Sequence, residues 1–219
     1  MAGPDRGLDL IDAMIRGGEQ AVAEFRYISG CEWFDEAPEY FLTTFVASSV
    51  SSSKSTYSLL EVSVNNSRKE AIALRRGRPA NHERRNGRFD IVVYWANDKP
   101  RGAVEVKSPI RSVTEQQIKP DIDELCSALS ASKNSTFQFG AFIYYAIVTE
   151  PKRIHDNASQ RLRDLLERID SKANEIAKSH RVDCLSIPGT IHRGENGGGA
   201  WCIAALVFTH EGGLQSFQS

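Results

Sequence analysis

The run from Arg88 to Lys107, RFDIVVYWANDKPRGAVEVK, constrains the fold more than any other part of the chain. It places two apolar segments, 91–95 and 103–106, on either side of the turn-rich stretch ANDKPRG. Short runs of β-branched and aromatic residues around a turn that contains Gly and Pro are typical of a β-hairpin. The sequence therefore predicts two neighbouring strands joined by a short connection.

Three charged residues accompany this hairpin: Asp90 precedes the first strand, and Glu105 and Lys107 lie in the second. Alternate residues of a strand share a face and lie about 6–7 Å apart. Glu105 and Lys107 should therefore project to one side, and Val104 and Val106 to the other. We expect the three charged side chains to converge on one divalent cation and one water molecule.

This combination of residues suits phosphodiester hydrolysis, which needs charge neutralisation on the phosphate and a water molecule that is nucleophilic near neutral pH. Carboxylate-held Mg²⁺ supplies both, and a lysine ammonium could steer the water or stabilise developing negative charge. The alternative is structural. Glu and Lys often alternate on the exposed face of an edge strand, and Asp90 could be a turn residue.

Asp90, fourteen intervening residues and the Glu-x-Lys triplet together resemble the PD-(D/E)xK nuclease superfamily, over roughly residues 35–150. The resemblance implies an α/β fold with a restriction-endonuclease-like αβββαβ core, in which helices flank a mixed central sheet. It also implies that Asp90 and Glu105 bind catalytic Mg²⁺ or Mn²⁺. The main-chain carbonyl of Val106 would share that ligand shell, and Lys107 would activate or orient water.

In this superfamily a glutamate from the first helix often joins the metal site. Glu39 in PEYFLTTF and Glu61 in LLEVSV could both match it. We favour Glu39 as the catalytic glutamate because its helix is better defined, although a glutamate in a first turn also stabilises the helix dipole. The glutamine and tyrosine of other members are not transferred, since no tyrosine follows Gln116 and Gln117 at helical spacing.

Basic residues are concentrated just before Asp90, where eight Arg and Lys residues between 68 and 88 face only Glu70 and Glu83. Such a segment attracts phosphate backbones, and the planar guanidinium group suits bidentate phosphate contacts. The predicted nucleic-acid-binding residues are Arg75, Arg76, Arg78, Arg84, Arg85 and Arg88. The alternative is a solvated loop without a ligand.

Apolar periodicity predicts two helices near the start of the chain. The first covers 8–28 and is interrupted at Gly17 and Gly18. The second follows Asp35 as its cap, and its expected buried stripe consists of Tyr40, Phe41, Phe45 and Val46. TYSLLEVSVNN alternates like a strand, and its charged continuation could be helical.

Later segments are patterned more clearly. We expect a helix over 118–131, a strand buried on both faces in FQFGAFIYYAIV, a long helix over 157–181, and two strands in RVDCLSIPG and WCIAALVFTH. Serine at 108 and proline at 109 should end the Glu-x-Lys strand. The acids at 121, 123 and 124 are interpreted as first-turn residues that stabilise the helix after Pro120.

The 219 residues suit a single nuclease-like domain, 1–219, with a helical extension at 1–34, a core at 35–150 and a helix-and-strand extension at 151–219. With 41% hydrophobic and 25% charged residues, and no apolar run near the roughly 18 residues that span a bilayer, no membrane association is expected. The start of the chain does not resemble a signal peptide, so a cytoplasmic location is expected. Cysteines and histidines lack zinc-site spacing.

The sequence therefore predicts a Mg²⁺-dependent endonuclease, with DNA as the expected substrate, that belongs to a restriction or phage-defence system. Cutting both strands of a duplex generally requires two active sites, which favours a homodimer. A partner chain could supply ATPase or recognition functions. The first alternative is a nuclease-fold nucleic-acid-binding or assembly module that is inactive or needs a partner, and the second is an interaction protein unrelated to nucleases.

Overall fold

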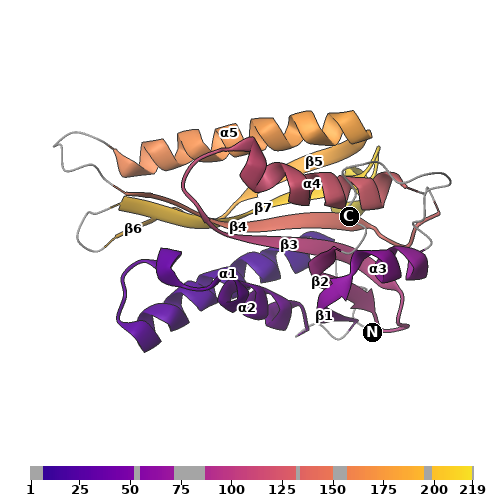
Figure 1. Ribbon diagram of the computed structural model, residues 1–219, viewed down its shortest axis with the longest axis horizontal. Coiled ribbons are helices and arrows are strands. Elements are labelled where there is room, and N and C mark those ends of the chain that lie inside the picture. Colours follow the sequence, from indigo (N-terminus) through magenta and orange to yellow (C-terminus); the bar gives the residue numbers. More distant parts are fainter. Residues whose placement is uncertain are drawn as a thin grey trace.

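The computed structural model describes residues 7–51, 55–71, 87–131, 134–149, 157–194 and 199–218. These residues form an α/β fold in which helices flank an open, mixed sheet of seven strands (Figure 1). The strand order is β1-β2-β3-β4-β7-β5, and β6 pairs with β7. Strands of the expected core and of the C-terminal extension therefore share one sheet.

The strands are β1 (Thr56–Ser63), β2 (Arg88–Trp95), β3 (Pro100–Ile110), β4 (Phe139–Thr149), β5 (Val182–Pro188), β6 (His192–Arg193) and β7 (Gly199–His210). The helices are α1 (Gly7–Ser29), the 3₁₀ helix η1 (Phe34–Glu36), α2 (Glu39–Ser51), α3 (Val64–Glu70), α4 (Glu115–Ser130), α5 (Ala158–His180) and α6 (Leu214–Gln218). No helix within the described residues combines the length and apolar character needed to cross a membrane.

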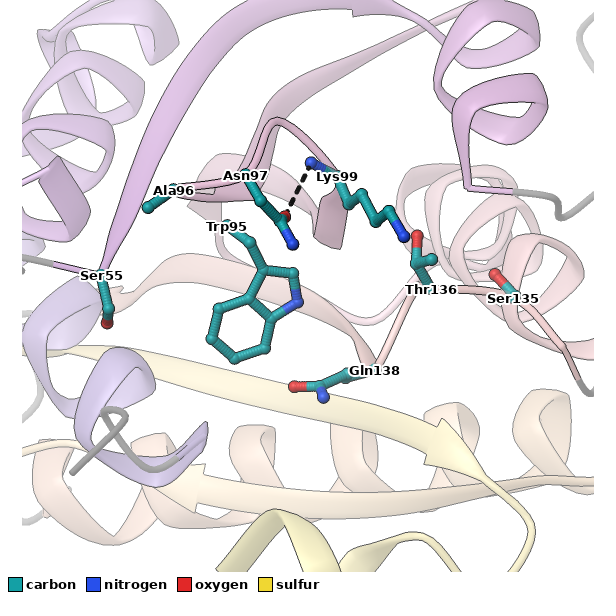
Figure 2. Close-up of a pocket in the computed structure, with 8 residues that line it drawn as sticks. All are labelled: Ser55, Trp95, Ala96, Asn97, Lys99, Ser135, Thr136 and Gln138. Atoms are coloured by element: carbon teal, nitrogen blue, oxygen red, sulfur yellow. Dashed lines mark hydrogen bonds between the residues drawn. The ribbon is translucent and has the colours of Figure 1, made fainter.

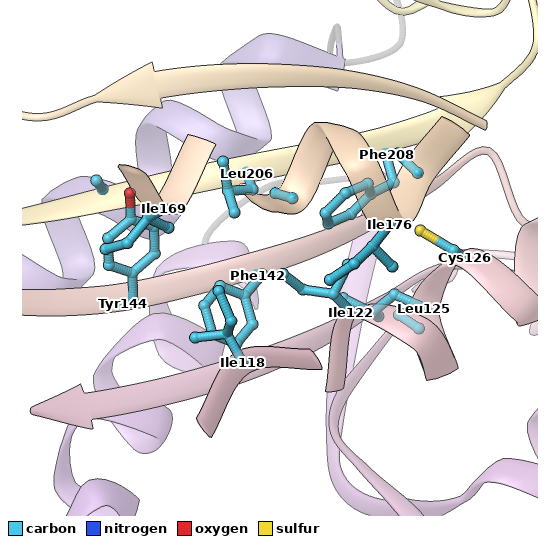
Figure 3. Packing of buried hydrophobic residues seen from close by; sticks show 14 of the residues in the cluster. Ile118, Ile122, Leu125, Cys126, Phe142, Tyr144, Ile169, Ile176, Leu206 and Phe208 are labelled. Carbon is cyan, nitrogen blue, oxygen red and sulfur yellow. The ribbon is translucent and has the colours of Figure 1, made fainter. Parts of the chain in front are cut away.

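Each face of the sheet carries its own core of buried side chains. Helices α1 and α2 cover one face, and α4 and α5 cover the other (Figure 1). On the second face, side chains of α4 and α5 interdigitate with those of β4 and β7 (Figure 3). The buried residues there include Ile122, Leu125, Phe142, Ile169 and Phe208. The predicted helix after the Glu-x-Lys strand, the buried strand and the long helix are confirmed.

The predicted hairpin is confirmed as well, because β2 and β3 pair antiparallel with Ile91 opposite Val104. Strand β3 pairs parallel with β4, and α4 makes the crossover that parallel neighbours need. The expected end of β3 was wrong: the strand continues through Ser108 and Pro109 to Ile110, with an irregular register after Lys107. An irregular ladder tolerates a residue without an N–H group.

Helix α1 is continuous, so the predicted interruption at Gly17 and Gly18 was wrong. A Cβ atom at Gly17 would lie 2.8 Å from the carbonyl oxygen of Phe45 in α2. One at Gly18 would lie 2.8 Å from a methyl group of Ile203 in β7. Both glycines therefore permit close packing of α1, and tertiary contacts outweigh their cost of about 1 kcal/mol each to helix propensity.

Helix α2 begins at Glu39, three residues later than a cap at Asp35 predicts, and Asp35 belongs to η1 instead of capping the helix. The predicted stripe was right only for Val46. Tyr40 is 54% exposed, Phe41 and Phe45 are half-buried, and the buried face consists of Leu42, Thr43, Val46, Ala47 and Val50. Apolar residues occur nearly all round this helix, so the sequence did not define which face is buried.

Part of the segment before β2 lies within the described residues. Residues 56–63 form the expected strand, and the charged continuation forms α3. Arg75, Arg76, Arg78, Arg84 and Arg85 lie outside the described residues, as does most of the glycine-rich segment at 194–199. The short elements β6 and α6 were not predicted, because two and five residues are too few to show a periodicity.

Candidate active site

The first feature of the site is the position of two acids on neighbouring strands. The β2–β3 ladder ends at the pair of Ile91 and Val104, and Asp90 and Glu105 are the next residues along the two strands. Val104 and Val106 belong to the core under α1 and α2. Because side chains alternate along a strand, Glu105 faces the other side, toward α4. The expected convergence of Asp90 with Glu105 is thus present in the structure.

Asp90 is held by a main-chain group of the neighbouring strand. Its Oδ2 accepts a hydrogen bond from the Val106 N–H at 2.7 Å, and its carboxyl group also hydrogen-bonds to Glu105. In a strand, the N–H and C=O groups of one residue face the same neighbour. The carbonyl of Val106 therefore faces the β2 side, where Asp90 lies.

The two acids occupy an environment that disfavours their charged forms. Burial raises the pKa of Glu105 well above its ordinary value, and the nearby Asp90 and Asp121 raise it further. Burial also raises the pKa of Asp90, although the hydrogen bond from Val106 opposes this shift. Two buried carboxyl groups in hydrogen-bonding contact cannot both ionise cheaply, so in the absence of a cation we expect them to share a proton.

Lys107 lies at the rim of this acidic centre and contacts two helices. Its Nζ is 3.5 Å from Oε2 of Glu39 in α2 and 4.0 Å from Oδ2 of Asp121 in α4. Oε2 of Glu39 also accepts a hydrogen bond from the Ser108 N–H at 2.9 Å. The side chain of Lys107 remains 33% exposed, so it is accessible from solvent.

The two glutamates that could match the helix glutamate have different positions. Glu39 is the first residue of α2 and contacts Lys107. Glu61 lies on edge strand β1, where Leu60 pairs with Ile91, and its side chain is exposed. Its φ of 55° is uncommon for a residue other than glycine. The structure thus brings Glu39, and not Glu61, to the Glu-x-Lys strand.

Two further acids of α4 face the site, which the sequence analysis missed. The helix begins at Glu115, so Asp121 and Glu124 are not first-turn residues, and their interpretation as such was wrong. Both are buried, with exposures of 8% and 7%, and both raise the pKa of Glu105. Residues three apart share a helix face. Their spacing from the buried Ile118 could have identified them.

Two arginines of the basic segment lie within the described residues. Arg88 is exposed at the start of β2, two residues before Asp90. Arg68 is buried, and its guanidinium donates to the main-chain carbonyl of Glu124 at 3.4 Å. Its observed contact therefore joins α3 to α4.

The donor set is small for a metal site. Among the residues that the structure describes, no group of three or more His, Cys, Asp or Glu side chains has the arrangement of a metal site. Mg²⁺ typically binds proteins through one or two carboxylates and completes its shell with water and substrate phosphate oxygens. Asp90, Glu105 and the Val106 carbonyl are a donor set of that kind.

The chain was compared with known proteins by family, by sequence and by structure. It matches no protein-family model, no curated protein and no solved structure. Its chemistry is therefore argued from the geometry of its own residues.

Proposed function

We propose that this protein is a metal-dependent nuclease that hydrolyses phosphodiester bonds, with DNA as the expected substrate. The main support is the contact between Asp90 and Glu105 across β2 and β3, with Lys107 beside them. The chain order α2, β1, β2, β3, α4, β4, with α3 as an addition, supports the comparison with the αβββαβ core of PD-(D/E)xK nucleases.

The residues present fit a hard divalent cation. Asp90 and Glu105 are acid ligands that burial and mutual repulsion leave poorly stabilised as a pair of anions. A cation between them would relieve that repulsion and displace their shared proton. When bound, Mg²⁺ or Mn²⁺ would polarise a phosphoryl oxygen and lower the pKa of a coordinated water. Asp90, Glu105 and the carbonyl of Val106 would hold it.

The other residues of the site act on charge and position. The ammonium of Lys107 would donate a hydrogen bond to the attacking water or to a non-bridging phosphate oxygen. Glu39, which contacts both Lys107 and the Ser108 N–H, positions that ammonium. In the reaction, the water molecule releases one proton to solvent and its oxygen bonds to phosphorus, while the bond from phosphorus to the leaving sugar oxygen breaks. The leaving oxygen takes up a proton from solvent.

Cleavage assays test this proposal. Purified protein with Mg²⁺ or Mn²⁺ should cut at least one member of a panel of single-stranded, duplex and nicked DNA and RNA. Lys107→Ala should lose that activity, and Lys178→Ala, an exposed lysine of α5, should retain it. Absence of cutting across the panel, or full activity of Lys107→Ala, contradicts the proposal.

A second measurement separates a nuclease from an inactive binding or assembly module. Calorimetric titration of Mn²⁺ should show one site in the wild type and a loss of that site in Asp90→Ala. Nucleic-acid binding by a protein that shows neither the Mn²⁺ site nor cleavage would favour the module instead. Salt-sensitive binding would then come from its basic residues alone.

A further inference from the structure

A second candidate site lies at the other end of the β2–β3 hairpin. A cavity of about 580 Å³ is lined by the last residue of β2, the turn that follows and the segment before β4. The lining residues include Trp95, Asn97, Lys99, Thr136 and Gln138 (Figure 2). Its volume lies within the range of about 300–1,000 Å³ that small-molecule sites occupy.

The indole of Trp95 lies at the centre of this cavity (Figure 2). The guanidinium carbon of Arg101 lies 4.0 Å from the centroid of the indole ring, and Arg101 is only 3% exposed. A cation over an aromatic face is attracted by the ring quadrupole and holds the ring in place. Arg101 therefore holds the Trp95 ring in its orientation in the cavity wall.

Polar groups that surround the indole are oriented as donors. Oε1 of Gln138 accepts a hydrogen bond from Nε of Arg101 at 3.3 Å, so its amide nitrogen is left to donate. Oδ1 of Asn97 accepts a hydrogen bond from the main-chain N–H of Lys99, also at 3.3 Å, so the amide nitrogen of Asn97 is likewise left to donate. Lys99 carries the only formal charge among the described residues that line the cavity, and that charge is positive.

The cavity is also built on fixed main chain. The hydroxyl of Thr136 donates to the Pro100 carbonyl at 2.7 Å, and the N–H of Gln138 donates to the Arg101 carbonyl at 2.7 Å. These two contacts join the segment before β4 to the start of β3. Because hydrogen bonds already hold these segments together, ligand binding would cost little conformational entropy to order them.

We propose that this cavity binds a nucleobase that stacks on Trp95. The amides of Asn97 and Gln138 would donate to the acceptor atoms on the edge of the base, and Lys99 would contact an adjacent phosphate. Stacking on an aromatic side chain accepts any base, since every base has a π-face. The inference rests on the proposed function: the base belongs to an unpaired part of the strand that the acidic centre cuts.

The separation of the two sites sets a minimum length for the strand. Asp90 and Trp95 are five residues apart on β2, which corresponds to about 17 Å at ~3.3 Å per residue. An odd separation turns the two side chains to opposite faces of the sheet, so the path between the two sites is longer than this distance. A stacked strand rises ~3.4 Å per nucleotide, so the unpaired base lies more than about five nucleotides from the scissile bond.

Fluorescence anisotropy with a labelled single-stranded oligonucleotide in EDTA, where no cutting occurs, tests the inference. Trp95→Ala should weaken binding by at least about fivefold. Trp95→Phe, which keeps an aromatic ring, should retain most of the affinity, and Trp33→Phe, outside the cavity, should retain all of it. Wild-type affinity in a folded Trp95→Ala protein would overturn the inference.

Two further arms identify the source of the base and separate the inference from the proposed function. If a mononucleotide competes as well as the oligonucleotide, the cavity binds a nucleobase, but the base does not belong to the substrate strand. When an abasic residue is moved step by step through the positions beyond about five nucleotides from the cut, one position should weaken wild-type binding and leave Trp95→Ala unchanged. If the protein cuts, and neither Trp95→Ala nor the abasic residue changes binding or cutting, only the nucleobase pocket is contradicted. If binding depends on Trp95 but no substrate is cut, only the nuclease activity is contradicted.

Discussion

The two ends of the β2–β3 hairpin contrast in charge and in burial. At one end, Asp90 and Glu105 are packed against each other and against further acids, and burial raises the pKa of both. At the other end, Trp95 is surrounded by hydrogen-bond donors and by the positive charges of Lys99 and Arg101. The same two strands thus offer an acidic centre suited to a cation and a donor-rich pocket suited to a base.

This difference shows how one rigid element can serve two kinds of ligand. The acidic centre is unfavourable without a cation, because its carboxyl groups repel one another. The Trp95 pocket needs no cation, because its donors are held by hydrogen bonds within the protein. Changes at one end should therefore leave the other unaffected, and the predictions below rely on that independence.

The largest effect is expected for Glu105→Gln, which removes one of the two ligand carboxylates. Cleavage should fall by about 10³-fold, the upper range for loss of one preorganised electrostatic contact. Binding of a single-stranded oligonucleotide in EDTA should stay within about twofold, since Trp95 and its rim are unchanged. Single-turnover cleavage and anisotropy measure the two quantities. A parallel loss of cleavage and of oligonucleotide binding would contradict the independence of the two ends of the hairpin.

A smaller effect is expected from pH on metal affinity. The raised pKa values of Glu105 and Asp90 mean that a proton competes with the cation. Affinity for Mn²⁺ should therefore fall as pH falls from about 8 toward about 5, and binding should release protons. Calorimetry in buffers of different ionisation enthalpy measures that release. A titration with no proton release throughout this pH interval contradicts the shared proton.

The stability of the metal-free protein should change in the opposite direction from activity. Burial raises the folded-state pKa of Glu105 well above 4.5, the ordinary value for a glutamate. The stability linked to this group is therefore full below that value and is lost as pH rises through the folded pKa. Glu105→Gln cannot ionise, so it should gain about 1 kcal/mol in free energy of unfolding at neutral pH.

Urea unfolding in EDTA measures this gain. Glu175→Gln serves as the control, because Glu175 lies on α5 with a side chain that is 68% exposed. The difference between Glu105→Gln and the wild type should shrink toward acidic pH, where the wild-type carboxyl is protonated. A Glu105→Gln protein that is less stable than the wild type at neutral pH would contradict repulsion at the acidic centre.

The smallest effect is expected for Lys99→Ala. Loss of one phosphate contact should weaken single-strand binding a few-fold and reduce the slope of log affinity against log salt by about 0.7. Cleavage at saturating substrate should be unchanged, because Lys99 lies at the far end of the hairpin. Lys178→Ala provides the control for surface charge. An unchanged salt slope in Lys99→Ala would contradict the proposed contact between Lys99 and a phosphate.

Local patterns predicted the elements that position the acidic centre. The hairpin around 96–99, the buried strand β4 and the long helix α5 all follow from periodicity and turn residues in contiguous sequence. The contact between Asp90 and Glu105 could be expected for the same reason, since both residues belong to one hairpin. The fold class was predicted at the level of a mixed sheet flanked by helices.

Other features depend on tertiary structure and could not be predicted locally. Gly17 and Gly18 break a helix by propensity, and only their contacts with α2 and β7 explain why α1 continues. Asp121 was misassigned because the true start of α4 lies before Pro120. The cavity around Trp95 combines three chain segments, among them the one around Thr136, that no short window contains.

A Mn²⁺-soaked crystal structure tests the central claim most directly. The account predicts an anomalous peak between the carboxylates of Asp90 and Glu105, about 2–2.5 Å from both, with the carbonyl of Val106 in the same shell. A peak at another site, or no peak while the two carboxyl groups keep their mutual hydrogen bond, would contradict it.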